Sequence, residues 1–146
     1  MNTKRDKIFY LFFGYFEVSV DVLSGLAMLL ATGYFMGSYL PGIHFFGNMQ
    51  EKSIEFIIRS FGYMVLMSGL MQFVGINYGG IRVRKYLLMA LMTGDFMQLF
   101  LSGLFFYSFD EWTGLMIFNF VFTFFLFVSR TVYLVIGVPE NTRFRL

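Results

Sequence analysis

The sequence has no cysteine, a single histidine, a single tryptophan and two prolines in 146 residues. Without cysteine the chain can form no disulfide, no thiolate metal site and no cysteine nucleophile. Charged residues are scarce as well, at 14% against about 25% in an average soluble domain. Phosphate-binding loops, serine-hydrolase elbows and zinc-protease motifs are also missing from the sequence. These absences exclude the enzyme classes that depend on those groups.

The chain is instead rich in bulky apolar residues, which make up 58% of it and include 22 phenylalanines and 11 methionines. A transmembrane helix needs about 20 consecutive apolar residues. Four stretches meet that length, over residues 8–39, 54–76, 86–107 and 112–138. The first is too long for the apolar core of a signal peptide and is interrupted by Glu17 and Asp21, so we expect a retained span. The sequence therefore predicts an all-α membrane protein, a single four-transmembrane-helix bundle over residues 1–146.

The basic residues alternate between the two sides that these spans would define. They gather before the first span, between the second and third, and after the fourth: Lys4, Arg5, Lys7, Arg82, Arg84, Lys85, Arg143 and Arg145. The opposite loops are acidic, apart from Lys52. By the positive-inside rule this predicts both termini on the cytoplasmic side, or on the matrix or stromal side in an organelle. We expect the membrane of the endoplasmic reticulum if the cell is eukaryotic. The clusters lie where topology requires them, so we expect no nucleic-acid partner.

Three ionisable residues lie deep inside separate spans, where a charge costs several kcal/mol and marks a site. Glu17 and Asp95 lie nine residues from the inner starts of their spans, and Arg130 lies eight residues before an inner end. At the helical rise of 1.5 Å per residue, all three sit roughly 12–14 Å above the inner boundary. We therefore expect them to meet on the axis of the bundle.

Neighbouring polar residues extend this level. Asp21 and Ser24 share a helical face with Glu17, and Gln98 shares one with Asp95. Three carboxyl groups against one guanidinium suggest that at least one is protonated at neutral pH, as proton donation to an alkene, epoxide or carbonyl requires. We predict the catalytic residues to be Glu17, Asp95 and Asp21, and the binding or supporting residues to be Arg130, Gln98, Ser24, Ser68 and Gln72.

The resulting hypothesis is a cavity, open to lipid, that binds, isomerises or cyclises an isoprenoid, sterol or lipid without a cofactor or metal. Its expected partners are the bilayer and that molecule, with a homo-oligomer or a larger membrane complex also open. The alternative is a non-catalytic accessory subunit, because buried polar residues can also join helices at about 0.6–2 kcal/mol per hydrogen bond. A proton or ion carrier is a third interpretation.

The last two spans resemble small four-span membrane proteins of fungi. The resemblance rests on the run from Thr93 to Leu99, on Trp112, Asn119 and Arg130, and on the closing run from Tyr133 to Gly137. More loosely, short spans with buried Glu and Asp are similar to the emopamil-binding and sigma-2 receptor (EXPERA) superfamily of sterol isomerases and sterol-binding proteins, and to membrane-bound terpene cyclases. The chain lacks the intramembrane histidines of the former and has fewer spans than the latter. The resemblance implies a hydrophobic ligand.

Overall fold

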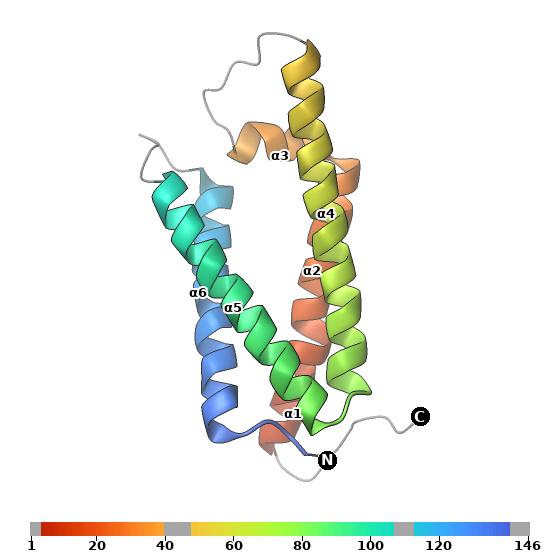
Figure 1. Cartoon of the computed structure of the whole chain (residues 1–146), viewed down its shortest axis with the longest axis vertical. Coiled ribbons are helices and arrows are strands. Elements are labelled where there is room, and N and C mark those ends of the chain that lie inside the picture. Colours follow the sequence, from red (N-terminus) through yellow and green to blue (C-terminus); the bar gives the residue numbers. More distant parts are fainter. Residues whose placement is uncertain (1–3, 40–47, 107–112, 141–146) are drawn as a thin grey trace. The chain divides into compact units, whose positions relative to one another are not determined.

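The computed structural model describes residues 4–39, 48–106 and 113–140, which are helical apart from short connections and contain no strand. The elements are α1 (Lys4–Leu11), η1 (Phe12–Phe16), α2 (Glu17–Leu30), α3 (Thr32–Tyr39), α4 (Asn48–Asn77), α5 (Ile81–Phe106) and α6 (Gly114–Ile136) (Figure 1). Four segments are long and apolar enough to cross a membrane, namely Lys4–Leu30, Lys52–Asn77, Ile81–Leu104 and Gly114–Ile136. The prediction of an all-α protein with four such helices is confirmed.

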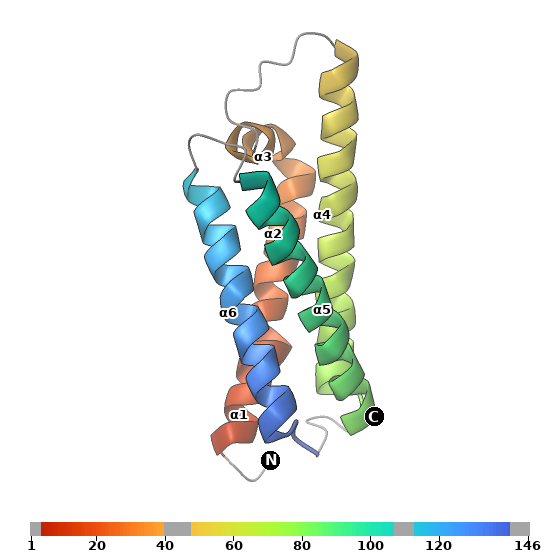
Figure 2. The same cartoon turned by 60° about the vertical axis from the view of Figure 1, so that its left-hand side comes forward.

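The chain divides into two compact units, Met1–Asn77 and Tyr78–Leu146. In the first unit α2 lies alongside α4, and in the second α5 lies alongside α6 (Figures 1 and 2). Each unit is thus built on a pair of antiparallel helices. The assembly of all four spans into a single domain stays a prediction.

The first apolar stretch does not form one helix over residues 8–39. The helix ends at Leu30, and Ala31 leaves helical geometry with φ −118° and ψ 41°. The Thr32 hydroxyl donates to the Met28 carbonyl at 2.8 Å, the acceptor that the Thr32 amide would use if the helix continued. From this break on, α3 runs across the end of α2 instead of prolonging it (Figures 1 and 2). Lys4–Leu30 is the part long enough to span.

Close contact between α2 and α4 depends on glycine. A Cβ atom built on Gly25 would lie 2.7 Å from the Gly62 carbonyl oxygen and 2.7 Å from the Leu66 nitrogen. A Cβ on Gly62 would lie 2.7 Å from that of Met28. Real Cβ atoms do not approach other heavy atoms this closely, so the two backbones touch where no side chain fits. We call Gly25, Gly62 and Gly69 the glycine seam.

In the second unit, one face of α6 packs on α5. Its buried residues, Met116, Thr123, Leu126 and Arg130, recur at spacings of three, four and seven, as a helix facing one neighbour requires. The Thr113 hydroxyl caps the start of α6 by accepting from the Met116 amide at 3.3 Å. The end falls at Gly137, whose φ of 96° suits glycine. The predicted fourth span and α6 therefore nearly coincide.

Arg84 closes the other end of this helix pair. It is completely enclosed, unlike its exposed neighbours Arg82 and Lys85. Its Nε and Nη2 atoms donate to the Gly79 carbonyl at 2.9 and 2.8 Å, and its Nη1 donates to the Pro139 carbonyl. In the sequence, Arg84 is one of the basic residues that predict the cytoplasmic side of the membrane. In the structure it also ties the segment after α6 to the start of α5.

Candidate functional site

The first polar site begins with a local departure from α-helical geometry. Residues Phe12–Phe16 form a π-helix, and the Glu17 amide donates to the Phe12 carbonyl five residues back instead of to the Phe13 carbonyl. Such turns are rare and frequently lie at functional sites. Glu17 follows directly and is completely enclosed, with no exposed surface. A buried carboxyl group and a π turn therefore meet at consecutive residues.

Two amide side chains of α4 bind carbonyls of this turn, one of them the Phe13 carbonyl that the Glu17 amide has left. Gln72 Nε2 donates to the Phe13 carbonyl at 3.0 Å, and Asn77 Nδ2 donates to the Gly14 carbonyl at 3.2 Å and to the Phe73 carbonyl at 2.9 Å. Both side chains are completely enclosed. Within the part of the chain that is described, Gln72 Oε1 and Asn77 Oδ1 have no hydrogen-bond partner.

Gly14 makes the approach of Asn77 possible. A Cβ atom at Gly14 would lie 3.0 Å from Asn77 Oδ1, 3.1 Å from Asn77 Nδ2 and 3.3 Å from Ile76 Cγ2. The Asn77 amide therefore occupies the space in which a side chain at residue 14 would begin. Asn77 is the last residue of α4, and its side chain belongs to this site.

The spacing of enclosed positions explains why the turn is needed. Phe13, Glu17, Asp21 and Gly25 follow one another at steps of four, and all are at least half-buried. In an α-helix each step of four overshoots a full turn by about 40°, so three steps would drift by about 120°. A π turn holds one extra residue, which removes about 100° of that drift. The sequence contains this signal, although periodicity alone assigns no geometry to it.

The other predicted residues of this unit lie on or near the same helix pair. Asp21 and Ser24 are half-buried, and the Asp21 Cβ lies 3.0 Å from a Cβ built on Gly69, so Asp21 packs against α4. Ser68 is half-buried beside Gly69. Asp21 on α2 lies opposite Gly69 on α4, and the two helices are antiparallel. Gln72 is three residues further along α4 and Val18 is three residues back along α2, so Gln72 lies beside Val18, next to Glu17. Gln72 is therefore level with Glu17, as a supporting residue should be.

The second polar site lies between α5 and α6. Arg130 Nη1 donates to Asp95 Oδ2 in an ion pair whose side chains are only 3% and 9% exposed. The same Nη1 atom donates to the Leu91 carbonyl at 3.3 Å. Asp95 and Arg130 thus lie at one level within this unit, as their predicted depths required. The geometry is that of a carboxylate held by a guanidinium, which is the strong form of such a contact.

Neutral polar pairs continue along the same helices. Gln98 Nε2 donates to Asn119 Oδ1 at 3.2 Å, and the Thr131 hydroxyl contacts Met92 Sδ at 3.3 Å. The spacing of Asp95 and Gln98 predicts that they share a helical face, and both bond to residues of α6. The spacing does not predict that Asn119 is the partner of Gln98. The partner of a polar side chain on another helix depends on the packing of the two helices, which spacing along one helix does not reveal.

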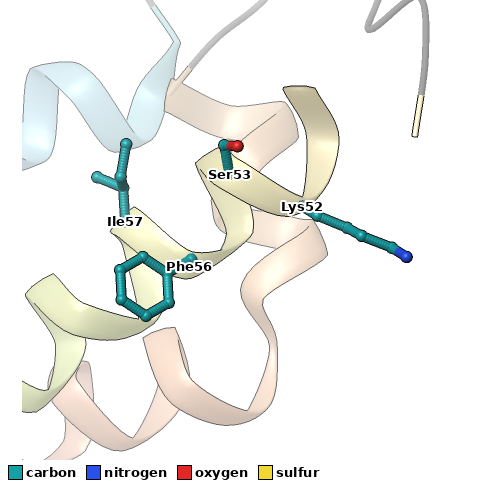
Figure 3. Close-up of a pocket in the computed structure, with 4 residues that line it drawn as sticks. All are labelled: Lys52, Ser53, Phe56 and Ile57. Carbon is teal, nitrogen blue, oxygen red and sulfur yellow. The ribbon is translucent and has the colours of Figure 1, made fainter. Parts of the chain in front are cut away.

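The structure brings together Asp95 with Arg130, and it brings Gln72 to the level of Glu17. The meeting of Glu17 with Asp95 and Arg130 stays a prediction. An open, shallow depression lies on the first turns of α4, lined by Lys52, Ser53, Phe56 and Ile57 (Figure 3). No predicted site residue lines it, so the depression belongs to neither polar site.

Metal ligands are not gathered anywhere in residues 4–39, 48–106 and 113–140, where no group of three or more His, Cys, Asp and Glu residues could hold an ion. His44 and Trp112 lie outside these ranges. No protein-family model, no curated protein and no solved structure matches the chain. The resemblances to the fungal four-span proteins, the sterol isomerase superfamily and the terpene cyclases therefore stay predictions.

Proposed function

We propose that this protein binds a hydrophobic small molecule, such as an isoprenoid, sterol or lipid, at an intramembrane polar site centred on Glu17, and isomerises or cyclises it. The observation that carries the proposal is the enclosed Glu17 carboxyl directly behind the π turn. A carboxyl group at bilayer depth is costly, and so is an interrupted helix. Two such costs at consecutive residues favour a functional role over helix packing alone.

Glu17 is the proton donor in this proposal. A carboxyl group in apolar surroundings can donate a proton to an alkene, epoxide or carbonyl of a bound molecule. Gln72 presents an acceptor oxygen at the same level, to which a hydroxyl of the ligand or a water molecule can donate. Asp21 lies one turn further along α2 and assists. An oxygen of Asp95 is engaged by Arg130, so we assign this pair a supporting role.

The membrane arrangement is part of the proposal. Both termini lie on the cytoplasmic side, because the basic residues flank the spans on that side. The outer faces of the helices carry exposed apolar side chains, including Leu23 on α2 and Phe124 on α6. A ligand that is itself apolar can then approach from the bilayer without crossing water.

Native mass spectrometry of the protein from mild detergent tests this function. We expect a small apolar molecule to be retained by the wild type and lost from Glu17→Gln, while circular dichroism shows that both are helical. Glu55→Gln is the matched control, because Glu55 pairs with Arg59 at 2.6 Å on a partly exposed face of α4. Loss of the ligand from both variants, or a wild type that retains none, would contradict the proposal.

The alternative is an accessory subunit of a larger membrane complex. Only 11% of the apolar windows of Lys52–Asn77 and Ile81–Leu104 is buried within the chain. Such helices offer wide apolar surfaces to lipid or to another membrane protein. The same mass spectra distinguish the two functions, since a stable heteromer without a small ligand supports the subunit role.

A further inference from the structure

We propose that Gln72 and Asn77 are positioning residues that hold the π turn and so determine which face of the first helical segment covers Glu17. The inference rests on the proposed role of Glu17, because the position of that segment matters to chemistry only if Glu17 takes part in it. It concerns how the site is kept enclosed, a property that the proposed function does not supply.

The hydrogen bonds show how the amides favour the π form. In an α-helix the Phe13 carbonyl would accept from the Glu17 amide, and the Gly14 carbonyl from the Val18 amide. In the structure Gln72 donates to the Phe13 carbonyl at 3.0 Å, and Asn77 donates to the Gly14 carbonyl at 3.2 Å. The Glu17 amide bonds one residue further back, to the Phe12 carbonyl. Gln72 thus gives the Phe13 carbonyl the donor that the π turn takes from it, and Asn77 binds the next carbonyl of the same turn.

The glycine seam decides which part of the chain turns if the amides are removed. Gly25 and Gly62 fix α2 against α4, since neither helix can rotate without driving backbone into backbone. Conversion of the π turn to an α turn would therefore leave Glu17 in place and rotate α1 by about one residue, or about 100°. Phe9 and Tyr10, which are both enclosed, face inward now. After the rotation, Tyr10 and Leu11 would face inward instead.

Aromatic contacts make the covering face a continuous surface. The Phe9 ring lies 5.2 Å from the Phe13 ring and 5.4 Å from the Tyr10 ring, centre to centre. Phe13 is enclosed one turn before Glu17. A rotation of α1 would separate this aromatic surface from the carboxyl group and open the site from its inner end.

Cysteine labelling can follow this rotation, because the natural chain has no cysteine. Single cysteines are placed in turn at Ile8, Phe9, Tyr10 and Leu11 of the full-length protein in bilayers, and their rates of modification by a small membrane-permeant thiol reagent are measured. In the parent chain we expect protection at positions 9 and 10 and reaction at 8 and 11. With Gln72→Leu and Asn77→Leu, protection should shift by one residue, so that position 9 reacts and position 11 is protected.

Deletion of one residue should reverse the effect of the two substitutions on the labelling pattern. Removing Phe16, a half-exposed residue of η1, takes out the extra residue of the turn and should restore protection at positions 9 and 10 even in the doubly substituted chain. A general loss of folding would expose all four positions and would not be reversed by a deletion. An unchanged pattern in the substituted chain, or a pattern that the deletion fails to restore, overturns the proposal. Single substitutions of Gln72 or Asn77 provide milder variants if the double variant does not fold.

The infrared carboxyl band of Glu17 gives a second readout. It is assigned as the band that Glu17→Gln removes. We expect the band to shift in the doubly substituted chain, as the covering face leaves, and to return on deletion of Phe16. A band that stays unchanged while the labelling pattern shifts would also overturn the proposal. Neither measurement uses a ligand, so a protein that shows the rotation but retains no apolar molecule would refute the proposed function and leave this inference standing.

Discussion

Replacing Asp95 with asparagine should destabilise the protein strongly, because it removes one member of a buried ion pair. Arg130 would keep its charge with only 3% of its side chain exposed, and it would lose the carboxylate that faces it from α5 while keeping its bond to the Leu91 carbonyl. Breaking a buried pair from one side costs about 3–5 kcal/mol. That corresponds to a fall of about two to four powers of ten in the folding equilibrium constant.

Removing both charges should be far less harmful. The double variant Asp95→Leu, Arg130→Met removes both charges of this pair, and such replacements are often neutral or stabilising by about 1–4 kcal/mol. The comparison variant Gln98→Leu breaks a neutral hydrogen bond to Asn119, and bonds of that kind between membrane helices average about 0.6 kcal/mol. The three variants therefore have well-separated expected stabilities.

Reversible unfolding in mixed micelles, followed by circular dichroism, measures these differences. The order expected is Asp95→Asn least stable, then Gln98→Leu, then the double variant at or above the wild type. A double variant no more stable than Asp95→Asn would refute the reasoning, since removing the Arg130 charge would then recover nothing.

Further predictions concern packing, capping and charge. Gly25→Leu should destabilise the α2–α4 pair by about 1–3 kcal/mol through overpacking. Gly94→Ala, with nothing near its Cβ position, should be neutral or stabilising by up to about 1 kcal/mol. Thermal unfolding compares the two variants. Arg84→Gln should loosen the segment around Pro139 and speed its proteolysis, since bonds to a charged donor contribute about 1.5–3 kcal/mol each, and the exposed Arg82→Gln should leave the cleavage rate unchanged. Glu55→Gln should cost less than about 0.5 kcal/mol in the same unfolding assay, because its ion pair with Arg59 is partly exposed.

Some features of the structure follow directly from the sequence. Apolar length predicts the four long helices, and helical rise predicts that Asp95 and Arg130 share a level. The i, i+4 spacing of Glu55 and Arg59 is that of a helical ion pair, which forms at 2.6 Å. These predictions succeed because they depend on one helix, or on simple distance along two antiparallel helices.

Other features depend on packing that spacing does not encode. The Thr32 hydroxyl bonds to the Met28 carbonyl at the break at Ala31, but Thr93 and Thr131 make the same bond inside continuous helices, so a threonine in an apolar run does not predict a break. The Gln72 and Asn77 bonds depend on the register between α2 and α4, which the glycine seam determines. Of three basic residues in the first turns of α5, only the folded chain shows that Arg84 is the enclosed one.

The ion pair between Asp95 and Arg130 also constrains how the protein is made. The two residues lie 35 positions apart, so Arg130 is synthesised about 2–7 s after Asp95 at about 5–20 residues per second. Each charged residue alone raises the cost of inserting its own helix by about 2.5–3.5 kcal/mol. The free-energy cost of insertion is therefore lower if the earlier helix stays beside the insertion machinery until the later one emerges, because the two then enter the lipid as a neutral pair.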